Sequence, residues 1–180
     1  MNTAVHPVLL LRRRTAVSGL IASAAALGLT GCGFALRQAP TFAFQTIRVE
    51  GSASAGVARE LREALQANGL QVLTSATPPT AHAAQAVLTV LGDQRERAVV
   101  GQTAAGQVRE LQLRTRFRFR LRGANEKSLI DDTELLLERD ISFNETAVLS
   151  KDAEEAMLYR DMQGDIVQQV LRRLAAVKSL

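Results

Sequence analysis

The 180-residue chain has a single cysteine, two histidines and no tryptophan. One cysteine excludes a disulfide bond within the chain. The sequence contains no G-x-S-x-G motif, no glycine-rich phosphate loop and no histidines and cysteines at metal-binding spacing. No apolar run reaches the roughly 20 residues that a transmembrane helix requires. These absences argue against an enzyme, and we expect no catalytic residue, metal site or cofactor.

The remaining polar candidates for catalysis have simpler interpretations. His82 lies in the proline- and alanine-containing segment 74–85, which favours an exposed loop residue over a catalytic one. Asp131 and Asp132 are adjacent in a strand-like segment, so their side chains alternate between opposite faces and do not converge on one substrate.

A basic and then apolar segment begins the chain. Arg12, Arg13 and Arg14 precede the uncharged run "AVSGLIASAAALGL" at 16–29. This order, with small residues near the end, is typical of a secretory signal peptide. A buried core helix is the alternative, and the arginine cluster suits it less well. We therefore expect residues 1–31 to be removed.

The cysteine lies directly after this run. The tetrapeptide "LTGC" at 29–32 looks like the lipobox of bacterial lipoproteins, in which the cysteine is lipidated and becomes the first mature residue. A free cysteine is more often a small buried hydrophobic residue, but the position of Cys32 favours lipidation. Several acyl chains on one residue anchor a protein firmly. Residue 33 is glycine, not the aspartate that tends to retain lipoproteins in the inner membrane, so we expect the periplasmic side of the outer membrane.

Charge and length describe an ordinary domain. The full chain has 22 basic and 18 acidic residues, and removing residues 1–31 takes away three arginines and no acid, leaving 19 against 18. A net charge this small gives no support for nucleic-acid binding. We assign 32–40 to a lipidated tether and 41–180 to a single domain, which is long enough to bury a core without disulfides or metals.

The hydrophobic periodicity changes several times along that domain. Aromatic and β-branched residues predict a strand at 41–51, and a 3.6-residue period predicts a helix at 54–69, capped by Ser54 and ended by Asn68-Gly69. A short strand is weakly indicated at 70–73. Three long period-2 segments with short connections predict antiparallel hairpins, and a final helix is expected, capped by Ser150. These last segments are 86–100, 107–123, 128–143 and 150–178.

This order predicts an α/β (α+β) fold. We expect a two-layer sandwich in which two helices pack on one face of a mixed, mainly antiparallel four-stranded sheet. The helix at 54–69 should bury Val57, Leu61 and Leu65. The helix at 150–178 should bury a stripe from Leu158 to Val177, weakened by Gly164 by about 1 kcal/mol relative to alanine.

An arginine ladder is the most conspicuous charged pattern. In "LRTRFRFRLR", alternate residues place five arginines on one face, with Phe117 and Phe119 facing the core. The ladder can bind anions. Alternatively, it can pair with acids of the next segment, such as Arg120 with Asp132, at about 0.2–1 kcal/mol per pair. The salt-bridged face is the favoured interpretation; the ladder consists of Arg114, Arg116, Arg118, Arg120 and Arg122, with Arg118 expected opposite Glu134 and Arg114 opposite Glu138.

A set of short motifs resembles one family in order along the chain. "CGFALR" (32–37) resembles the mature start of the LptE family of outer-membrane lipopolysaccharide-assembly lipoproteins, and further motifs follow: "TIRVEG", "ALQANGL", "GQVRELQL" and "AVLSKDAEEAMLYRDM". The resemblance implies a two-layer protein that plugs the LptD β-barrel, assists its assembly and binds lipopolysaccharide. The implied partners are the LptD barrel, lipopolysaccharide and, through the anchor, the membrane.

The resemblance also implies two lipopolysaccharide-binding positions. In the family, basic residues near the middle hairpin tip and at the entry to the last helix are assigned this role, and Lys151 matches the second position. At the tip this chain has Ala104 and Ala105, so Arg109 is the nearest substitute. Both cations are expected to be exposed and unpaired, with Arg114, Arg116 and Arg118 as weaker candidates.

Two functions from another class use the same anchor. A lipid-anchored envelope enzyme or a cell-wall-binding lipoprotein would share the signal peptide and Cys32. A stoichiometric barrel partner distinguishes the lipopolysaccharide-assembly protein from both.

Overall fold

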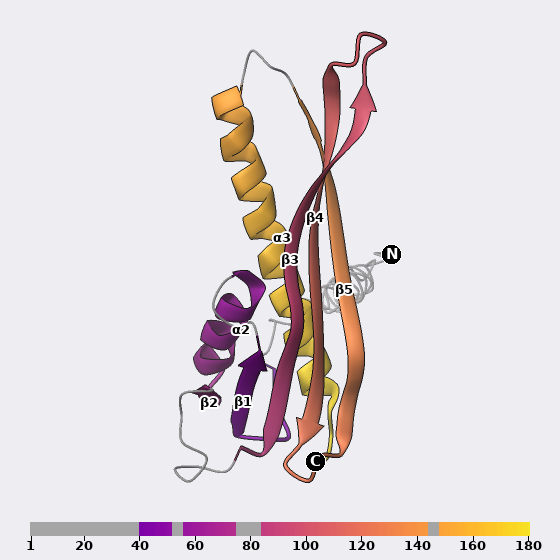
Figure 1. Cartoon of the computed structure of the whole chain (residues 1–180). Coiled ribbons are helices and arrows are strands. Elements are labelled where there is room, and N and C mark those ends of the chain that lie inside the picture. Colours follow the sequence, from indigo (N-terminus) through magenta and orange to yellow (C-terminus); the bar gives the residue numbers. More distant parts are fainter. Residues whose placement is uncertain (1–39, 52–55, 75–83, 144–147) are drawn as a thin grey trace, which may run out of the picture. The chain divides into compact units, whose positions relative to one another are not determined.

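A computed structural model describes residues 40–51, 56–74, 84–143 and 148–180, all within one compact unit, Ala39–Leu180. Cys32, the tether up to residue 39, Ser54 and His82 lie outside the described residues. Within these described ranges, two helices and five strands follow one another (Figure 1). In order they are β1 (Thr46–Gly51), α2 (Gly56–Ala67), β2 (Gln71–Thr74), β3 (Ala86–Gln102), β4 (Val108–Gly123), β5 (Ser128–Ser142) and α3 (Val148–Ala176).

The strands form one mixed sheet in the order β2-β1-β3-β4-β5. β1 runs parallel to both β2 and β3, while β3, β4 and β5 form an antiparallel meander. The expected two-layer fold is therefore confirmed. The sheet has five strands where four were expected, because the weakly indicated segment at 70–73 pairs with β1 from Thr46↔Gln71 onward.

The first strand begins five residues later than the prediction of 41–51. Phe44 is buried, so its aromatic side chain serves the core without belonging to the ladder. The backbone N–H groups of Gln45 and Thr46 donate to the Gln85 side-chain oxygen, at 2.7 and 3.3 Å. The aromatic residues before Thr46 therefore indicated burial and not a strand. The Gln85 side chain, in place of a neighbouring strand, accepts the backbone N–H groups at this point. The three long strands agree with prediction to within two residues at each end.

The two helices cover one face of the sheet (Figure 1). We call the end with β1, α2, β2 and the β4–β5 turn the base, and the end with the β3–β4 turn the distal end. The C-terminal half of α3 lies at the base and its N-terminal half toward the distal end. The main core cluster fills the base, and a smaller cluster lies distally; the smaller one consists of Leu111, Leu113, Ile141, Tyr159 and Met162.

Helix α2 buries the predicted face, with Val57, Leu61 and Leu65 almost fully covered. Its end also follows the prediction. Gly69 has a φ of 85°, and its N–H and that of Leu70 donate back into the last turn, to Gln66 and Leu65. Glycine adopts this left-handed conformation without steric cost, which is why Asn68-Gly69 ends the helix.

Helix α3 begins two residues before the prediction, at Val148. Ser150 therefore lies inside the first turn, and its assignment as the capping residue is wrong. Sequence alone favoured it because serine followed by acids is a common start signal, but the apolar residues Val148 and Leu149 already belong to the helix. The expected stripe is largely confirmed, since Met162, Ile166, Val170, Leu171 and Leu174 are buried. No helix among the described residues has the length and apolar character to span a membrane.

Candidate functional site

At the distal end, the β3–β4 hairpin extends beyond the helices (Figure 1). A tight turn closes it: the N–H of Thr103 donates to the carbonyl of Gln107 at 2.8 Å, and that of Gly106 to the carbonyl of Thr103 at 2.9 Å. Val99 and Val100, near the tip, are about half exposed. The hairpin thus presents an ordered backbone with apolar side chains in solvent.

Arg109 is the second residue of β4, next to the β3–β4 turn, and is exposed, as expected. Its backbone carbonyl accepts a hydrogen bond from the N–H of Phe143 at 2.8 Å, which fixes its position on the sheet. No residue in the described part of the chain pairs with its guanidinium group. Glu110 alternates to the other face, opposite Ser142, so it does not neutralise Arg109 directly.

Lys151 differs from the expectation. Its Nζ lies 2.8 Å from Glu154 Oε2 and donates to Ser142 Oγ at 3.2 Å, and its side chain is only 19% exposed. The prediction of an exposed, unpaired amine at Lys151 is therefore wrong. A helix places residues three apart, here Lys151 and Glu154, on one face, and the prediction did not take this pair into account.

The two predicted residues are nevertheless held at the same end of β5. Arg109 is tied through its carbonyl to Phe143, and Lys151 through its amine to Ser142. The cations thus flank the last residues of one strand, with Arg109 the accessible charge and Lys151 a partly covered one.

The arginine ladder is a salt-bridged face. Arg114 pairs with Glu138 at 2.9 Å, and Arg116 with Glu134 at 2.7 Å and with Glu96 at 3.4 Å. The expected positions of Arg114 opposite Glu138 and Arg118 opposite Glu134 are confirmed. The expected contact between Arg120 and Asp132 also forms, at 3.9 Å, although a register shift follows Phe119.

This open face is polar and close to charge-balanced. Acids approach the arginines from both neighbouring strands, since Glu96 comes from β3 and Glu134 from β5. The sequence argument paired the ladder only with β5 and missed Glu96. Phe117 and Phe119 are fully buried on the opposite face, as predicted.

A second polar group, which sequence reasoning missed, lies between the two core clusters. A register shift between Val90 and Gly92 changes which side chains of β3 face the helices. After it, Asp93 lies opposite Phe117 and Arg95 opposite Thr115, on the buried face. The signal was Gly92, because an isolated glycine within a strand often marks a bulge.

Asp93, which lies on β3, caps the N-terminal end of α2. Its Oδ2 accepts the N–H of Ala58 at 3.1 Å, and a Cβ at Gly56 would lie 2.8 Å from the same oxygen. Gly56 has a φ of 63°, so glycine suits both its conformation and this close approach. Burial raises the pKa of the Asp93 carboxyl, against the opposing effects of the Ala58 N–H and Arg95.

Gln163 and Tyr159 of α3 complete this group, which we call the polar seam (Asp93, Arg95, Tyr159, Gln163 and Glu60). Gln163 accepts from Arg95 and donates to Glu60 Oε2 at 2.7 Å and to the carbonyl of Gly56 at 3.0 Å. The Tyr159 hydroxyl donates to the carbonyl of Glu96 at 2.6 Å, and Arg95 lies 5.2 Å from its ring centre. Burial also raises the pKa of Tyr159. These contacts position α2 and α3 on the sheet and are structural.

Comparison with known proteins adds a family to this geometry. Residues 44–174 match the family model for LptE, described as lipopolysaccharide-assembly. A solution structure of an uncharacterized lipoprotein B from Nitrosomonas europaea is 31% identical, with a TM-score of 0.66 over 80% of this chain and 91% of that one. Searching the curated proteins gave no significant match.

Two further structures share the fold at lower identity. The rare lipoprotein B from Shewanella oneidensis is 20% identical, with a TM-score of 0.60 over 73% of this chain and 94% of that one. A minor lipoprotein from Acinetobacter baumannii is also 20% identical, with a TM-score of 0.58 over 76% and 94%.

The two-layer fold and the family match together define a lipopolysaccharide-assembly lipoprotein of the outer membrane. More specifically, the chain belongs to the LptE family, because the family model covers more than half of it. The resemblance found in the sequence is thereby confirmed.

Proposed function

We propose that this protein plugs the LptD β-barrel, assists its assembly, and contacts lipopolysaccharide during delivery to the outer leaflet. Membership of the LptE family supports the general role, since that family acts in lipopolysaccharide assembly. The observation that best supports a plug is the open face of the sheet. Its arginines are paired with acids on β3 and β5, and a polar, charge-balanced face suits the polar interior of a membrane barrel.

The proposed anchor is acylated Cys32, at the periplasmic side of the outer membrane. Its support is the lipobox in the sequence and the lipoprotein relatives. An acylated Cys32 at the start of the protein is the expected result of mass spectrometry on protein from outer membranes, and an unmodified thiol or an intact Met1 start would contradict it. A non-enzymatic role follows from the family.

The proposed lipopolysaccharide contact is the distal end, with Arg109 as its main cation. Lipopolysaccharide carries phosphates and carboxylates, which a guanidinium group binds well when no acid neutralises it. Arg109 is exposed and without a described partner, whereas Lys151 must first leave Glu154. We therefore assign Lys151 a secondary role and the paired arginines of the ladder none.

A pull-down from detergent-solubilised outer membrane tests the plug. The expected result is stoichiometric recovery of LptD with the wild-type protein. Disrupting the open face with Arg116→Glu and Arg118→Glu should reduce this recovery, because both changes place unpaired acids beside Glu134. Arg59→Glu with Arg160→Glu, two exposed positions on the helices, is the control with the same change in charge. Recovery of the wild-type protein alone, or with cell-wall fragments, would contradict the proposal.

A further inference from the structure

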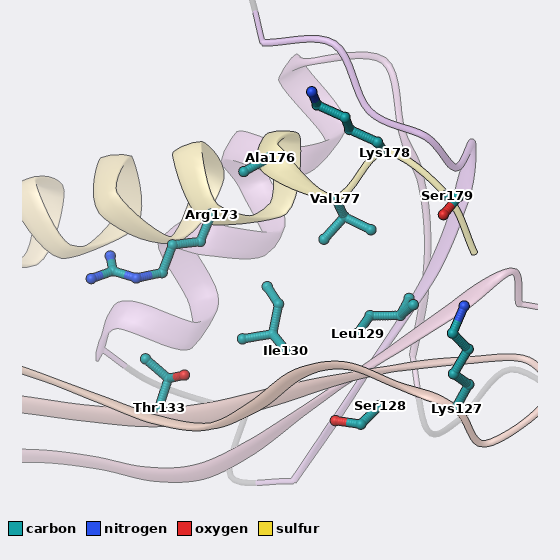
Figure 2. Close-up of a pocket in the computed structure, with 10 residues that line it drawn as sticks. All are labelled: Lys127, Ser128, Leu129, Ile130, Thr133, Arg173, Ala176, Val177, Lys178 and Ser179. Atoms are coloured by element: carbon teal, nitrogen blue, oxygen red, sulfur yellow. The ribbon is translucent and has the colours of Figure 1, made fainter.

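A pocket at the base combines basic and apolar side chains. It has a volume of about 520 Å³ and lies between the end of α3 and the start of β5 (Figure 2). Figure 2 shows Val177 on the helical side facing Leu129 and Ile130 on the strand side. These three side chains pack against the main core and are only partly buried, so they give the pocket an apolar wall.

The charged residues that line this pocket are all basic. Lys127, Arg173 and Lys178 line it, and no acidic side chain does. The acids that neutralise the ladder and Lys151 have no counterpart here, and in the described part of the chain no acid pairs with any of these three cations. Arg173 donates to the carbonyl of Gln169 at 3.3 Å, which leaves Lys127 and Lys178 as the cations without a described partner. An apolar wall beside two such lysines suits a ligand that has both an acyl chain and a phosphate.

The pocket also lies where the chain enters the domain. The carbonyl of Gln85 accepts the N–H of Ala124 in the β4–β5 turn at 3.1 Å, and its side chain accepts the N–H groups of Gln45 and Thr46. The segment leading to β1 therefore reaches the same end of the sheet as the turn that carries Lys127. Pro40, the first described residue, follows Cys32 by eight positions, and eight residues span at most about 30 Å in any conformation.

We propose that this pocket binds an anionic glycerophospholipid of the leaflet that carries the anchor. The phosphate is bound by Lys127 and Lys178, and one acyl chain lies along Val177, Leu129 and Ile130. The inference rests on the lipid anchor of the proposed function, but on neither the barrel nor the lipopolysaccharide contact.

Native mass spectrometry of the acylated, detergent-purified protein with added phosphatidylglycerol tests the pocket. The wild type should retain one phosphatidylglycerol, and more than it retains of phosphatidylcholine. Lys127→Glu with Lys178→Glu should weaken retention by about 25-fold or more, since each basic residue near a lipid surface contributes about fivefold. The matched control, Arg59→Glu with Arg160→Glu, changes the charge equally outside the pocket and should retain the lipid.

A variant that fills the apolar part of the pocket tests the acyl-chain site separately from the phosphate site. Val177→Trp lies just beyond the end of α3 and keeps all three cations, so it should block the acyl chain and lower retention while the protein stays folded. Thermal melting of each variant checks folding, because cations near a helix C-terminus also stabilise the helix. Lipid retention by Val177→Trp at the wild-type level would overturn the acyl-chain site.

Three other outcomes would also overturn the proposal. They are equal retention of phosphatidylcholine, loss of lipid from the control, and displacement of phosphatidylglycerol by millimolar inorganic phosphate alone. Lipopolysaccharide retention and LptD recovery are measured on the same pocket variant. Both should be unchanged, so a failure of the proposed function is seen separately from a failure of the pocket.

Discussion

The base and the distal end share one sheet but are built differently. Twenty buried residues form the main core at the base, where both helices and all five strands meet, whereas five form the distal cluster beneath a single helix. The polar seam separates the two clusters. The base therefore carries most of the hydrophobic stabilisation. The distal end carries exposed apolar residues and Arg109, whose guanidinium has no partner among the described residues. Stability and the proposed recognition thus lie at opposite ends of one long meander.

Truncating one leucine in each cluster should give the largest contrast. Leu88→Ala at the base should lower the free energy of unfolding by about 3–5 kcal/mol. Leu111→Ala in the distal cluster should lower it by about 2–3 kcal/mol, because a thinner cluster next to solvent can relax around the cavity. Urea denaturation measures both changes. Equal losses would show that the distal cluster is as firmly packed as the base.

Changing Asp93 tests the seam between the two regions. Asp93→Ala removes the acceptor for the Ala58 N–H and should cost about 1–2 kcal/mol. Asp93→Asn keeps an oxygen at this position but cannot ionise, which makes it the control for charge. Chemical denaturation at neutral pH measures both, and an Asp93→Ala variant as stable as the wild type would remove the capping role.

The same pair gives a pH dependence. Burial raises the pKa of Asp93 in the folded state above its ordinary value of 3.8, so the folded protein holds this proton to higher pH than the unfolded chain. The stability that protonated Asp93 contributes is fully present below about pH 3.8, and it is lost as the pH rises through the folded-state pKa of this carboxyl. Wild-type stability relative to Asp93→Asn should therefore fall with rising pH in that window. A rise would mean that the Ala58 N–H and Arg95 outweigh burial.

A smaller effect is expected at Gly164, where α3 passes α2. An added Cβ would lie 3.6 Å from Glu60 Oε1, an ordinary contact, so Gly164→Ala should stabilise the protein by about 1 kcal/mol through helix propensity. The contrasting variant is Gly69→Ala, which places a side chain at a φ of 85° and should destabilise by about 1 kcal/mol. Thermal melting distinguishes the two; a lower melting temperature for Gly164→Ala would indicate that the helices cannot accept the methyl group.

The smallest effect is expected on the open face. Glu134→Gln removes one of the two acids that pair with Arg116 but should cost no more than about 1 kcal/mol, because the pair is partly solvated. Arg116→Gln should leave lipopolysaccharide retention unchanged. A large loss of retention at unchanged melting temperature would make the ladder a ligand site after all.

The sequence predicted the fold well where one pattern controlled one element. The 3.6-residue period gave both helices, and period 2 gave the three long strands and the burial of Phe117 and Phe119. The fifth strand was only weakly indicated, since four residues show too little periodicity and depend on pairing with β1.

The sequence named the candidate cations but did not predict which of them is paired. The resemblance to the LptE family pointed to Arg109 and Lys151, yet the pairing of Lys151 depends on Glu154 and on Ser142 of β5. Predicting the polar seam would have required knowledge of the register shift near Gly92, which turns Asp93 and Arg95 inward. It would also have required the contacts that Arg95 makes with α3, far along the chain. Such contacts between distant residues leave little local signal.

Lipopolysaccharide retention by the immobilised, detergent-purified protein tests the role of the distal end most directly. Arg109→Glu with Lys151→Glu is compared with Arg59→Glu, a reversal at an exposed position of α2 in the base, at low and moderate salt. The account predicts that the double variant loses most retention and most of its salt dependence, with Arg109 responsible for the larger part, while LptD recovery is kept. Wild-type retention in the double variant, or equal loss in Arg59→Glu, would contradict it.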